Sequence, residues 1–296
     1  MKIIERNLQE LGKSLFVSLP KEWVKTYKLK KGSKIKMMSS DKGLLTIAPE
    51  FTTQEKTKET IIEFDEHFER KFFREYFNGN EKITILIKNI TEKQRRALYE
   101  FLKRFITIQI VEESESKIIL KSFKIEELSI EECLKRLFFL SIGMIEELIS
   151  SNNKTILQEM RDNMTRFYYL LVMQIRRFLD EGKFTKENQI PLVRAMDFRM
   201  VSEKIQRIGE IVINLNNIRT KELKQFLGEL NDHYSKSVFS FLSNNYPKAQ
   251  EHWERGKQLK KKFERLLKNQ TSQGKEQIKD IGQILRYANE MAGLIR

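Results

Sequence analysis

The chain shows three successive patterns of hydrophobic and polar positions, and the first covers about fifty residues. Residues 14–19 alternate apolar and small polar side chains and stop at Pro20, which is typical of a short strand. A short helix is expected next, because Trp23, Val24 and Tyr27 fall on one side of it. Two further strands are expected after glycine-containing turns: turns at 31–33 and 40–43, strands at 34–39 and 44–48.

The second pattern, over residues 56–122, mixes helix and strand. Four aromatic residues recur at four-residue spacing and predict one face of a helix: Phe64, Phe68, Phe72 and Tyr76. Thr91 and Gln94 form a capping box for a helix that runs to about residue 105. The remaining apolar runs are expected to be strands, at 83–88, 107–111 and 117–121. A small α/β unit is therefore predicted, without a glycine-rich phosphate loop.

From Ser129 onward the pattern is helical. Ser129 and Glu132 form another capping box. Six helices with apolar stripes are predicted, over 129–149, from 154 to about 182, and over 191–215, 220–242, 247–267 and 275–296. Short loops make neighbouring helices antiparallel, and residues 206–210 superimpose on 286–290. These features predict two three-helix repeats, about 125–218 and 219–296.

Together the patterns predict a multidomain α+β protein. Its expected domains are a β-rich module over 1–50, a small α/β domain over 51–124, and an all-α domain over 125–296. The short strands expected in this module and its one helical turn form a very small core, which would be marginally stable alone. The first module is therefore expected to need a partner chain.

Charge draws attention to the same module. The chain carries a formal net charge of +14 and has a pI near 9.6. Residues 1–50 hold eleven basic and five acidic residues, a net charge of +6. Such an excess attracts polyanions. The alternative reading, that these are ordinary solvated lysines, stays open at this point.

Other classes of protein find little support in the residues. One cysteine, Cys133, excludes an intrachain disulfide framework, and the three histidines lack metal-motif spacing. The N-terminal residues lack the apolar core of a signal peptide, and no apolar run reaches the length of a membrane span. We expect a soluble, cytoplasmic protein. No nucleophile elbow, His-acid pair or phosphate loop suggests catalysis, so no enzyme is expected.

The first module resembles a known family. The string from Arg6 to Val24, RNLQELGKSLFVSLPKEWV, followed by the Leu-Lys-Lys-Gly-Ser turn of 29–33, is similar to the AbrB/SpoVT/MazE-type swapped-hairpin family. Ser33 stands where that family usually has an aspartate, and its hydroxyl can cap the turn in a similar way. The resemblance covers roughly residues 3–49.

That resemblance implies an intertwined homodimer in which two chains build one β-barrel. It also implies that basic residues on the barrel bind double-stranded DNA. Arg6, Lys13 and Lys21 would contact phosphates, and Arg6 could also reach a guanine edge. Lys30 and Lys31 in the following turn complete the candidate DNA-binding residues. The alternative is a dimerisation module with solvated lysines.

The helical region resembles the PhoU family of phosphate-uptake regulators. The resemblance rests on the tandem three-helix pattern and on three segments, 165–171, 203–210 and 286–292. The order of the two modules is similar to that in a group of archaeal regulators. It implies a sensory or partner-binding domain, linked to phosphate homeostasis and able to contact a phosphate-transport or signalling protein.

The PhoU resemblance also implies paired acids that bind metal, and here the pattern is incomplete. Glu210 and Glu290 keep one acid of each pair and are the candidate metal ligands. Gln206 and Arg286 replace the other acids, and Thr165 stands where an aspartate is expected. Half of the carboxylates are missing, so we expect no metal cofactor, with Glu290 pairing instead with a neighbouring basic residue.

Three hypotheses follow. The first is a homodimeric transcriptional regulator with a DNA-binding barrel and a sensory helical domain. The second is a regulatory adaptor that binds a phosphate transporter or sensor kinase and uses the barrel only to dimerise. The third is a metal-responsive helical protein. Four aromatic residues of the helical region are expected to be core packing rather than binding residues: Phe138, Phe139, Tyr168 and Tyr169. Cys133 is expected to be inert.

Overall fold

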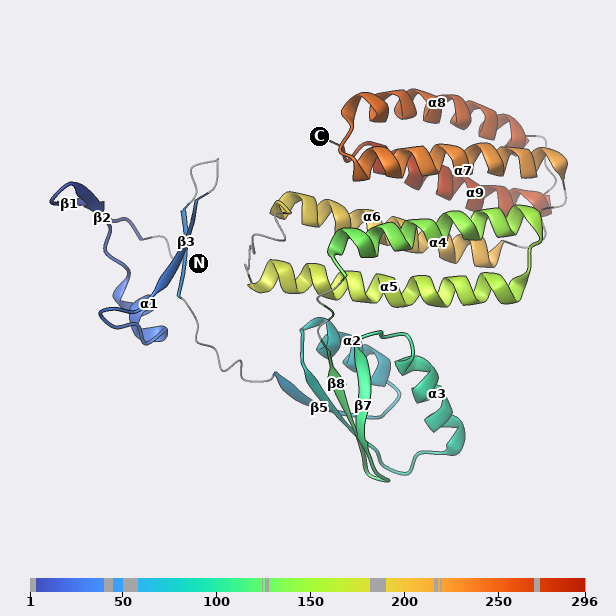
Figure 1. Cartoon of the computed structure of the whole chain (residues 1–296). Coiled ribbons are helices and arrows are strands. Elements are labelled where there is room, and N and C mark those ends of the chain that lie inside the picture. Colours follow the sequence, from blue (N-terminus) through green and yellow to red (C-terminus); the bar gives the residue numbers. More distant parts are fainter. Residues whose placement is uncertain are drawn as a thin grey trace. The chain divides into compact units, whose positions relative to one another are not determined.

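The computed structural model describes residues 4–39, 45–49, 58–123, 125, 128–181, 190–215, 218, 220–268 and 272–295. The chain forms two compact units, residues 1–56 and 57–296 (Figure 1). The turn expected at 40–43 lies outside the described residues.

The first unit contains two antiparallel hairpins and one short helix. Strands β1 (Gln9–Leu11) and β2 (Ser14–Phe16) form the first hairpin, and β3 (Ile35–Ser39) and β4 (Leu45–Pro49) form the second. Helix α1 (Lys21–Thr26) lies between them in sequence. The strand expected over 14–19 ends at Phe16, because Gln9 pairs with Phe16 and β1 offers no partner beyond it.

This unit has almost no core of its own. Among the residues whose side chains are described, Pro49 is the only buried one between 4 and 49. Large apolar side chains are instead open to solvent, and the most exposed of them are Leu8, Leu11 and Leu15, at 65%, 73% and 67%. Both faces of β1 and β2 are exposed. One chain by itself therefore does not bury the apolar side chains of the small core predicted from the sequence.

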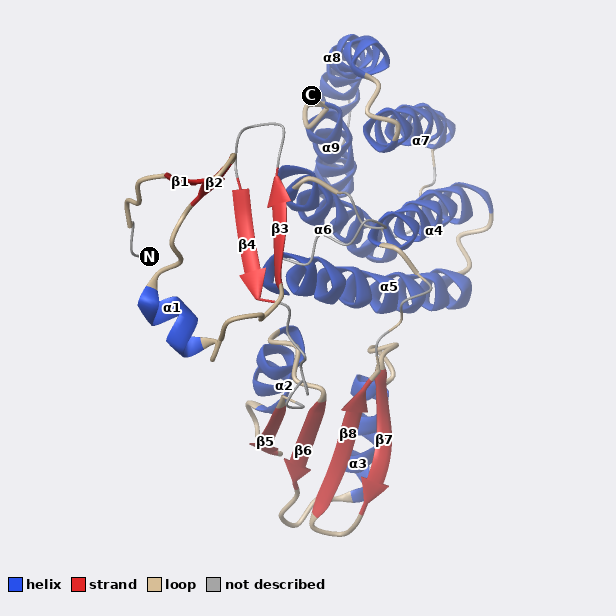
Figure 2. Cartoon of the chain, turned by 60° about the vertical axis from the view of Figure 1, so that its left-hand side comes forward, coloured by secondary structure: helices blue, strands red, loops and turns tan. Residues whose placement is uncertain are grey.

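The second unit begins with a four-stranded sheet. Its strands are β5 (Glu59–Glu63), β6 (Lys82–Leu86), β7 (Ile108–Glu113) and β8 (Lys117–Ser122), in the order β5-β6-β8-β7. The β5–β6 pair is parallel and the other two pairs are antiparallel. Helices α2 (Phe68–Phe77) and α3 (Glu92–Leu102) cover one face of the sheet (Figure 2).

Two features of this sheet differ from expectation. Strand β5 was not predicted, since its apolar residues are few and it lies at an edge of the sheet. The helix expected to include Phe64 begins at Phe68, because Asp65 turns the chain by accepting the His67 backbone N–H at 3.0 Å. Phe64 still packs on Phe68, with ring centroids 5.1 Å apart.

Aromatic packing joins the sheet to the helices that follow. The Tyr169 ring of α5 (Lys154–Glu181) stacks on Phe105 at 5.1 Å and meets the Phe73 ring edge-on at 5.2 Å. Arg176 Nε also donates a hydrogen bond to the Phe77 carbonyl at 3.0 Å. The small α/β part and the first helices therefore pack as neighbours within the second unit.

The described residues from 128 onward form two groups of three helices. The first comprises α4 (Ile130–Ser150), α5 and α6 (Leu192–Asn214), and the second comprises α7 (Lys221–Leu242), α8 (Tyr246–Lys268) and α9 (Ser272–Ala292). The two groups meet where α4 packs on α7 and α6 packs on α9. The predicted tandem three-helix arrangement is present. None of the helices described is long and apolar enough to cross a membrane.

Local capping signals define several helix starts. Thr91 with Gln94 and Ser129 with Glu132 form both hydrogen bonds of a capping box, as the sequence predicts. Thr220 Oγ1 accepts the Leu223 backbone N–H at 3.3 Å and caps α7.

Most of the aromatic residues assigned to the core do pack inside. Phe138 is fully buried, and Tyr168 and Tyr169 are partly buried against the core. Phe139 corrects the expectation, since it is 52% exposed. It follows Phe138 on α4, and successive helical residues point about 100° apart, so one of the two turns outward. Cys133 is buried, and burial raises the pKa of its thiol to about 12, which disfavours the reactive thiolate.

Candidate nucleic-acid interface

The first hairpin places Lys13 at its tip. Leu11 pairs with Ser14, so the turn holds only Gly12 and Lys13. Gly12 has φ +67°, the left-handed conformation that two-residue hairpin turns need and that glycine adopts without steric cost. The Lys13 side chain is exposed. The turn therefore presents a cation at the end of the β1–β2 hairpin.

Helix α1 is short and is stabilised by contacts between residues close in sequence. Pro20 is its N-cap residue, and its carbonyl accepts the Val24 N–H at 3.0 Å. The Trp23 and Tyr27 rings meet edge-on, with centroids 5.3 Å apart. Lys21, in the first turn, is exposed.

The end of α1 is closed by a Schellman motif. The Leu29 N–H bonds the Val24 carbonyl at 2.9 Å, and the Lys28 N–H bonds the Lys25 carbonyl at 3.1 Å. This motif needs a left-handed residue after the helix, and here Lys28 takes that place with φ +51°. A lysine at a position that favours glycine carries a conformational cost.

The next turn carries Lys30 and Lys31 and is fixed by Ser33. Ser33 Oγ accepts the Lys30 backbone N–H at 2.9 Å, and the Ser33 N–H donates to the Lys30 carbonyl at 2.9 Å. The hydroxyl therefore caps the turn, as expected for a serine at this position. Both lysine side chains are exposed.

The five candidate DNA-binding side chains share exposure but not one segment. Arg6 precedes β1, Lys13 lies in the hairpin turn, Lys21 starts α1, and Lys30 and Lys31 lie in the turn after it. Within the described part of the chain none of the five forms an ion pair. Their charges are thus available to an anionic partner.

The residues considered for metal binding do meet in the first three-helix group, but as a hydrogen-bonded set. Gln206 Nε2 donates to Thr165 Oγ1 at 3.2 Å and to Glu210 Oε1 at 3.3 Å. Arg161 Nε lies 3.3 Å from the same Glu210 oxygen. The carboxylate therefore faces a guanidinium and an amide instead of other acids.

The negative charge of Glu290, in the second group, is balanced by neighbouring cations. Its carboxylate forms ion pairs with Lys204 and, at 3.4 Å, with Arg286 Nε on the same helix. The predicted pairing of Glu290 with basic neighbours is confirmed. Across the described residues no group of three His, Cys, Asp or Glu side chains could hold a metal ion. The side chains present do not fit the metal cluster that the PhoU resemblance implies.

Sequence reasoning did not single out one buried polar pair in the second three-helix group. The fully buried His233 on α7 donates from Nε2 to Asn289 Oδ1 on α9 at 2.8 Å, and its Nδ1 is buried without a partner. Burial lowers the pKa of His233. Its place on the apolar face of α7, between Leu230 and Tyr234, is the signal that predicts burial; no local pattern predicts Asn289 as partner.

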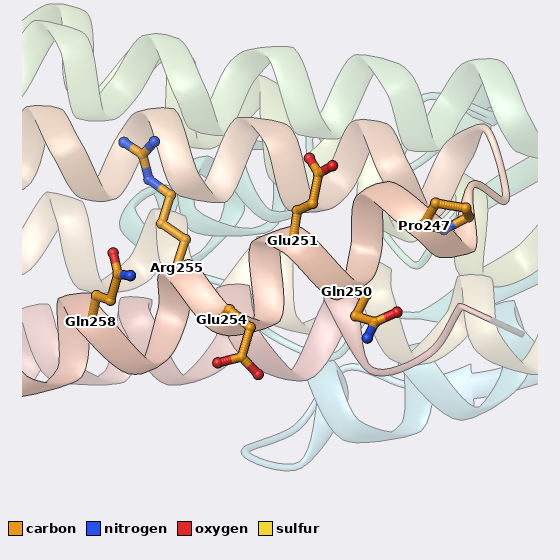
Figure 3. A pocket seen from close by; sticks show the side chains of 6 residues that line it. All are labelled: Pro247, Gln250, Glu251, Glu254, Arg255 and Gln258. Atoms are coloured by element: carbon orange, nitrogen blue, oxygen red, sulfur yellow. The ribbon is translucent and has the colours of Figure 1, made fainter.

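Helix α8 borders a shallow groove of about 650 Å³ (Figure 3). Its lining is mostly polar, with Gln250, Glu251, Glu254, Arg255 and Gln258 after Pro247. Arg255 is held by Asp232 of α7 at 2.9 Å. All six lining residues come from one helix and include no histidine, cysteine or hydroxyl nucleophile.

Comparison with known proteins bears on the first unit. Residues 8–53 match the family described as "Antidote-toxin recognition MazE, bacterial antitoxin". No curated protein matches the chain, and no solved structure does. The match supports the resemblance to the AbrB/SpoVT/MazE-type family at the N-terminus, and nothing comparable supports the PhoU resemblance. The first unit thus carries a domain like that of a regulatory, non-enzymatic family that binds DNA or a toxin and is typically dimeric.

Proposed function

We propose that the chain is a homodimeric DNA-binding transcriptional regulator. The observation that carries the proposal is the combination, within residues 4–49, of exposed cations with apolar side chains that the chain itself leaves uncovered. The family match over residues 8–53 adds support, because members of that family bind DNA or a toxin and are typically dimeric.

Dimerisation accounts for the exposed apolar side chains. Leu8, Leu11 and Leu15 are more than 60% exposed on a hairpin of two three-residue strands. An isolated hairpin of this size has little stability in water. A second copy of the module would cover these side chains and add strands on either side, which is the intertwined barrel that the family resemblance implies.

Binding of DNA accounts for the cations. Arg6, Lys13 and Lys21 are exposed and carry no carboxylate partner in the described residues. Binding of such unpaired lysine and arginine side chains to phosphates is favourable, because it releases the counterions that surround the DNA. Two chains bring twice this charge to one duplex.

The helical region would then decide when the DNA is bound. Its two three-helix groups meet through the α4–α7 and α6–α9 contacts, so a ligand or partner that favours one packing could shift the other. A link to phosphate homeostasis, with a phosphate-transport or signalling protein as partner, follows from the PhoU resemblance alone and stays a prediction.

A salt series tests the DNA proposal. The full-length protein is titrated onto a mixed-sequence 30-base-pair duplex at several salt concentrations. Wild-type affinity is expected to fall steeply with salt. In the Arg6/Lys13/Lys21→Gln variant, the slope of log affinity against log salt concentration is expected to be shallower by about 0.9 for each phosphate contact removed. The matched control replaces three exposed cations of the second unit, Arg70, Lys93 and Lys221. Absent or salt-insensitive wild-type binding would end the proposal.

The family description favours one competing function, recognition of a toxin protein. In that case, and equally for an adaptor that binds a transporter or sensor kinase, the barrel would serve dimerisation and protein contact. Charge reversal at Arg6, Lys13 and Lys21 separates these functions. It abolishes a DNA function while leaving the function of an adaptor largely intact.

A further inference from the structure

The positive charge of the chain has a second concentration outside the first unit. Residues 57–128 are neutral, with fourteen basic and fourteen acidic residues. Helix α8 alone holds eight basic and three acidic residues, a net charge of +5. The excess of the whole chain, +14, is therefore carried largely by the first fifty residues and by one helix.

Helix α8 lies on the outside of its three-helix group. It packs against α7 and α9 (Figure 1). Its buried side is apolar and small, with Ala249, Gly256, Leu259 and Leu266 facing those helices. The opposite side is open to solvent, so the charge lies where a partner can reach it.

The cations of α8 divide into paired and unpaired ones, and Lys248, near the start of the helix, is an exposed one with no ion pair among the described residues. Three of them have carboxylate partners: Arg255 pairs with Asp232 at 2.9 Å, Lys257 with Glu254 at 2.7 Å, and Lys262 with Glu229 at 2.6 Å. Four exposed ones toward the C-terminal end form no ion pair within the described residues, and we name them the α8 basic face: Lys260, Lys261, Arg265 and Lys268.

The α8 basic face is continuous. At about 100° per residue its four side chains fall within an arc of about 140°, and at 1.5 Å per residue they span about 12 Å along the helix. A DNA duplex carries one phosphate charge per about 1.7 Å of axis, so this length meets several phosphates. Glu264 is exposed within the same arc and is the one acid there.

We propose that the α8 basic face is a second contact for the phosphate backbone of DNA. Phosphates would supply the counter-charges that carboxylates of the protein supply to Arg255, Lys257 and Lys262. A membrane surface is disfavoured, because an interfacial helix inserts its apolar side and that side of α8 is already buried against α7 and α9. The proposal rests on the proposed function for the nature of the partner, and on α8 alone for the site.

The test measures the salt dependence of binding to the same mixed-sequence duplex. In the full-length protein, the four residues of the α8 basic face are replaced by glutamine. The slope of log affinity against log salt is expected to fall by about 0.9 per lost contact, and by up to about 3.6 in all. The matched control replaces four dispersed exposed cations, Arg70, Lys93, Arg166 and Lys221, and should change the slope little.

A second variant keeps the proposal falsifiable if the first folds poorly. Glu264→Gln removes the one acid of the arc and is expected to tighten duplex binding, which a damaged fold would not do. An unchanged slope in the first variant with unchanged affinity in Glu264→Gln overturns the proposal. So does an equal effect in the dispersed control. Loss of binding to phosphatidylserine vesicles, with duplex binding intact, would assign the face to membranes instead.

The two proposals fail separately. If Arg6/Lys13/Lys21→Gln abolishes duplex binding and the α8 variant matches wild type, the proposed function stands and the second contact is wrong. If the α8 variant loses the salt-dependent binding and the first-unit variant retains it, the second contact stands and the DNA-binding role of the first unit is wrong.

Discussion

His233 on α7 donates a hydrogen bond from Nε2 to Asn289 Oδ1 on α9 at 2.8 Å, in a site that excludes solvent from the imidazole. The other ring nitrogen is buried without a partner. A proton on Nδ1 would have no acceptor there, so the folded protein holds this histidine neutral. The bond links the first and third helices of the second group across its core.

This neutral histidine predicts that stability falls in acid. Burial is the largest cause that lowers the pKa of His233, and His252 and Arg255 of α8 lower it further, against Asp232 of α7 and Asn289. The unfolded chain then binds the proton near its ordinary pKa of about 6.5, while the folded chain binds it only at lower pH. Stability is therefore full above about pH 6.5 and declines below it, by at most about 1.4 kcal/mol per pH unit for this group. Urea unfolding between pH 8 and 5 measures the slope.

The control for this pH dependence is the neighbouring histidine. Burial also lowers the pKa of the partly exposed His252, so it contributes in the same direction. His252→Gln should leave most of the acid dependence in place, and His233→Gln should remove most of it at some cost at pH 8. Equal slopes in wild type and His233→Gln would contradict the assignment.

The same cluster makes Gly256 sensitive to a methyl group. A Cβ at Gly256 would lie 2.1 Å from Asn289 Oδ1, so Gly256→Ala forces Asn289 away and leaves His233 Nε2 unsatisfied. Gly228 on α7 is the matched control, because nothing lies within 4 Å of its Cβ position. Gly228→Ala is expected to stabilise by up to about 1 kcal/mol. Gly256→Ala is expected to be less stable than that control by about 1–3 kcal/mol in chemical unfolding, and equal stabilities would refute this.

Lys28 offers a stabilising change in the first unit. Its φ of +51° after α1 suits glycine, and its N–H is already used in the Schellman motif. Lys28→Gly is expected to stabilise the module by about 1 kcal/mol, visible as a higher melting temperature. Asn152→Gly, at a similar φ of +52°, should gain less, because asparagine tolerates this conformation. A lower melting temperature for Lys28→Gly would argue against the motif.

Substitution of the exposed leucines of the first unit is expected to lower the mass of the protein in solution. Leu11→Asp or Leu15→Asp places a charge where the proposed dimer buries apolar surface, so the protein should shift from about twice the 35.4 kDa chain mass to the single-chain mass in light scattering. Val193→Asp is the control, since Val193 is 44% exposed at the start of α6. A wild-type protein with the mass of one chain would rule the dimer out.

Metal ions are expected to leave the wild-type melting temperature unchanged, because cations of the protein already face Glu210 and Glu290. Thr165→Asp with Gln206→Glu restores two acids beside Glu210, and this variant should gain stability with added Mn²⁺, by about 2.7 kcal/mol at a hundred times the dissociation constant. A rise in the wild-type melting temperature on adding Mn²⁺ would reinstate the metal hypothesis.

Local signals in the sequence predicted much of the fold. The capping boxes at Thr91 and Ser129 and the apolar stripes placed the helices within a few residues, because these patterns act over one or two turns. Strand β5 was not predicted, because this short edge strand is stabilised by pairing with β6, about twenty residues away in the sequence. The exposure of Phe139 was not predicted, because the sequence does not indicate which of two neighbouring apolar residues faces the core.

The candidate sites divide in the same way. Ser33 could be predicted to cap its turn, because donor and acceptor are three residues apart. The pairing of Lys204 with Glu290 joins residues 86 apart on different helices, and only the packing of α6 on α9 brings them together. The unpaired state of the α8 basic face likewise depends on which acids α7 presents, so the lysine run alone does not reveal it.

In the proposed dimer, the open apolar surface of the first unit would make DNA binding depend on the concentration of the protein. When the cover for a module's side chains must come from another copy, its folded fraction obeys mass action and rises with protomer concentration. In a cell where synthesis slows, dilution would dissociate the proposed dimer and expose the apolar side chains of both chains at once. Occupancy of an operator would then depend on the square of protomer concentration, giving a threshold before any effector acts.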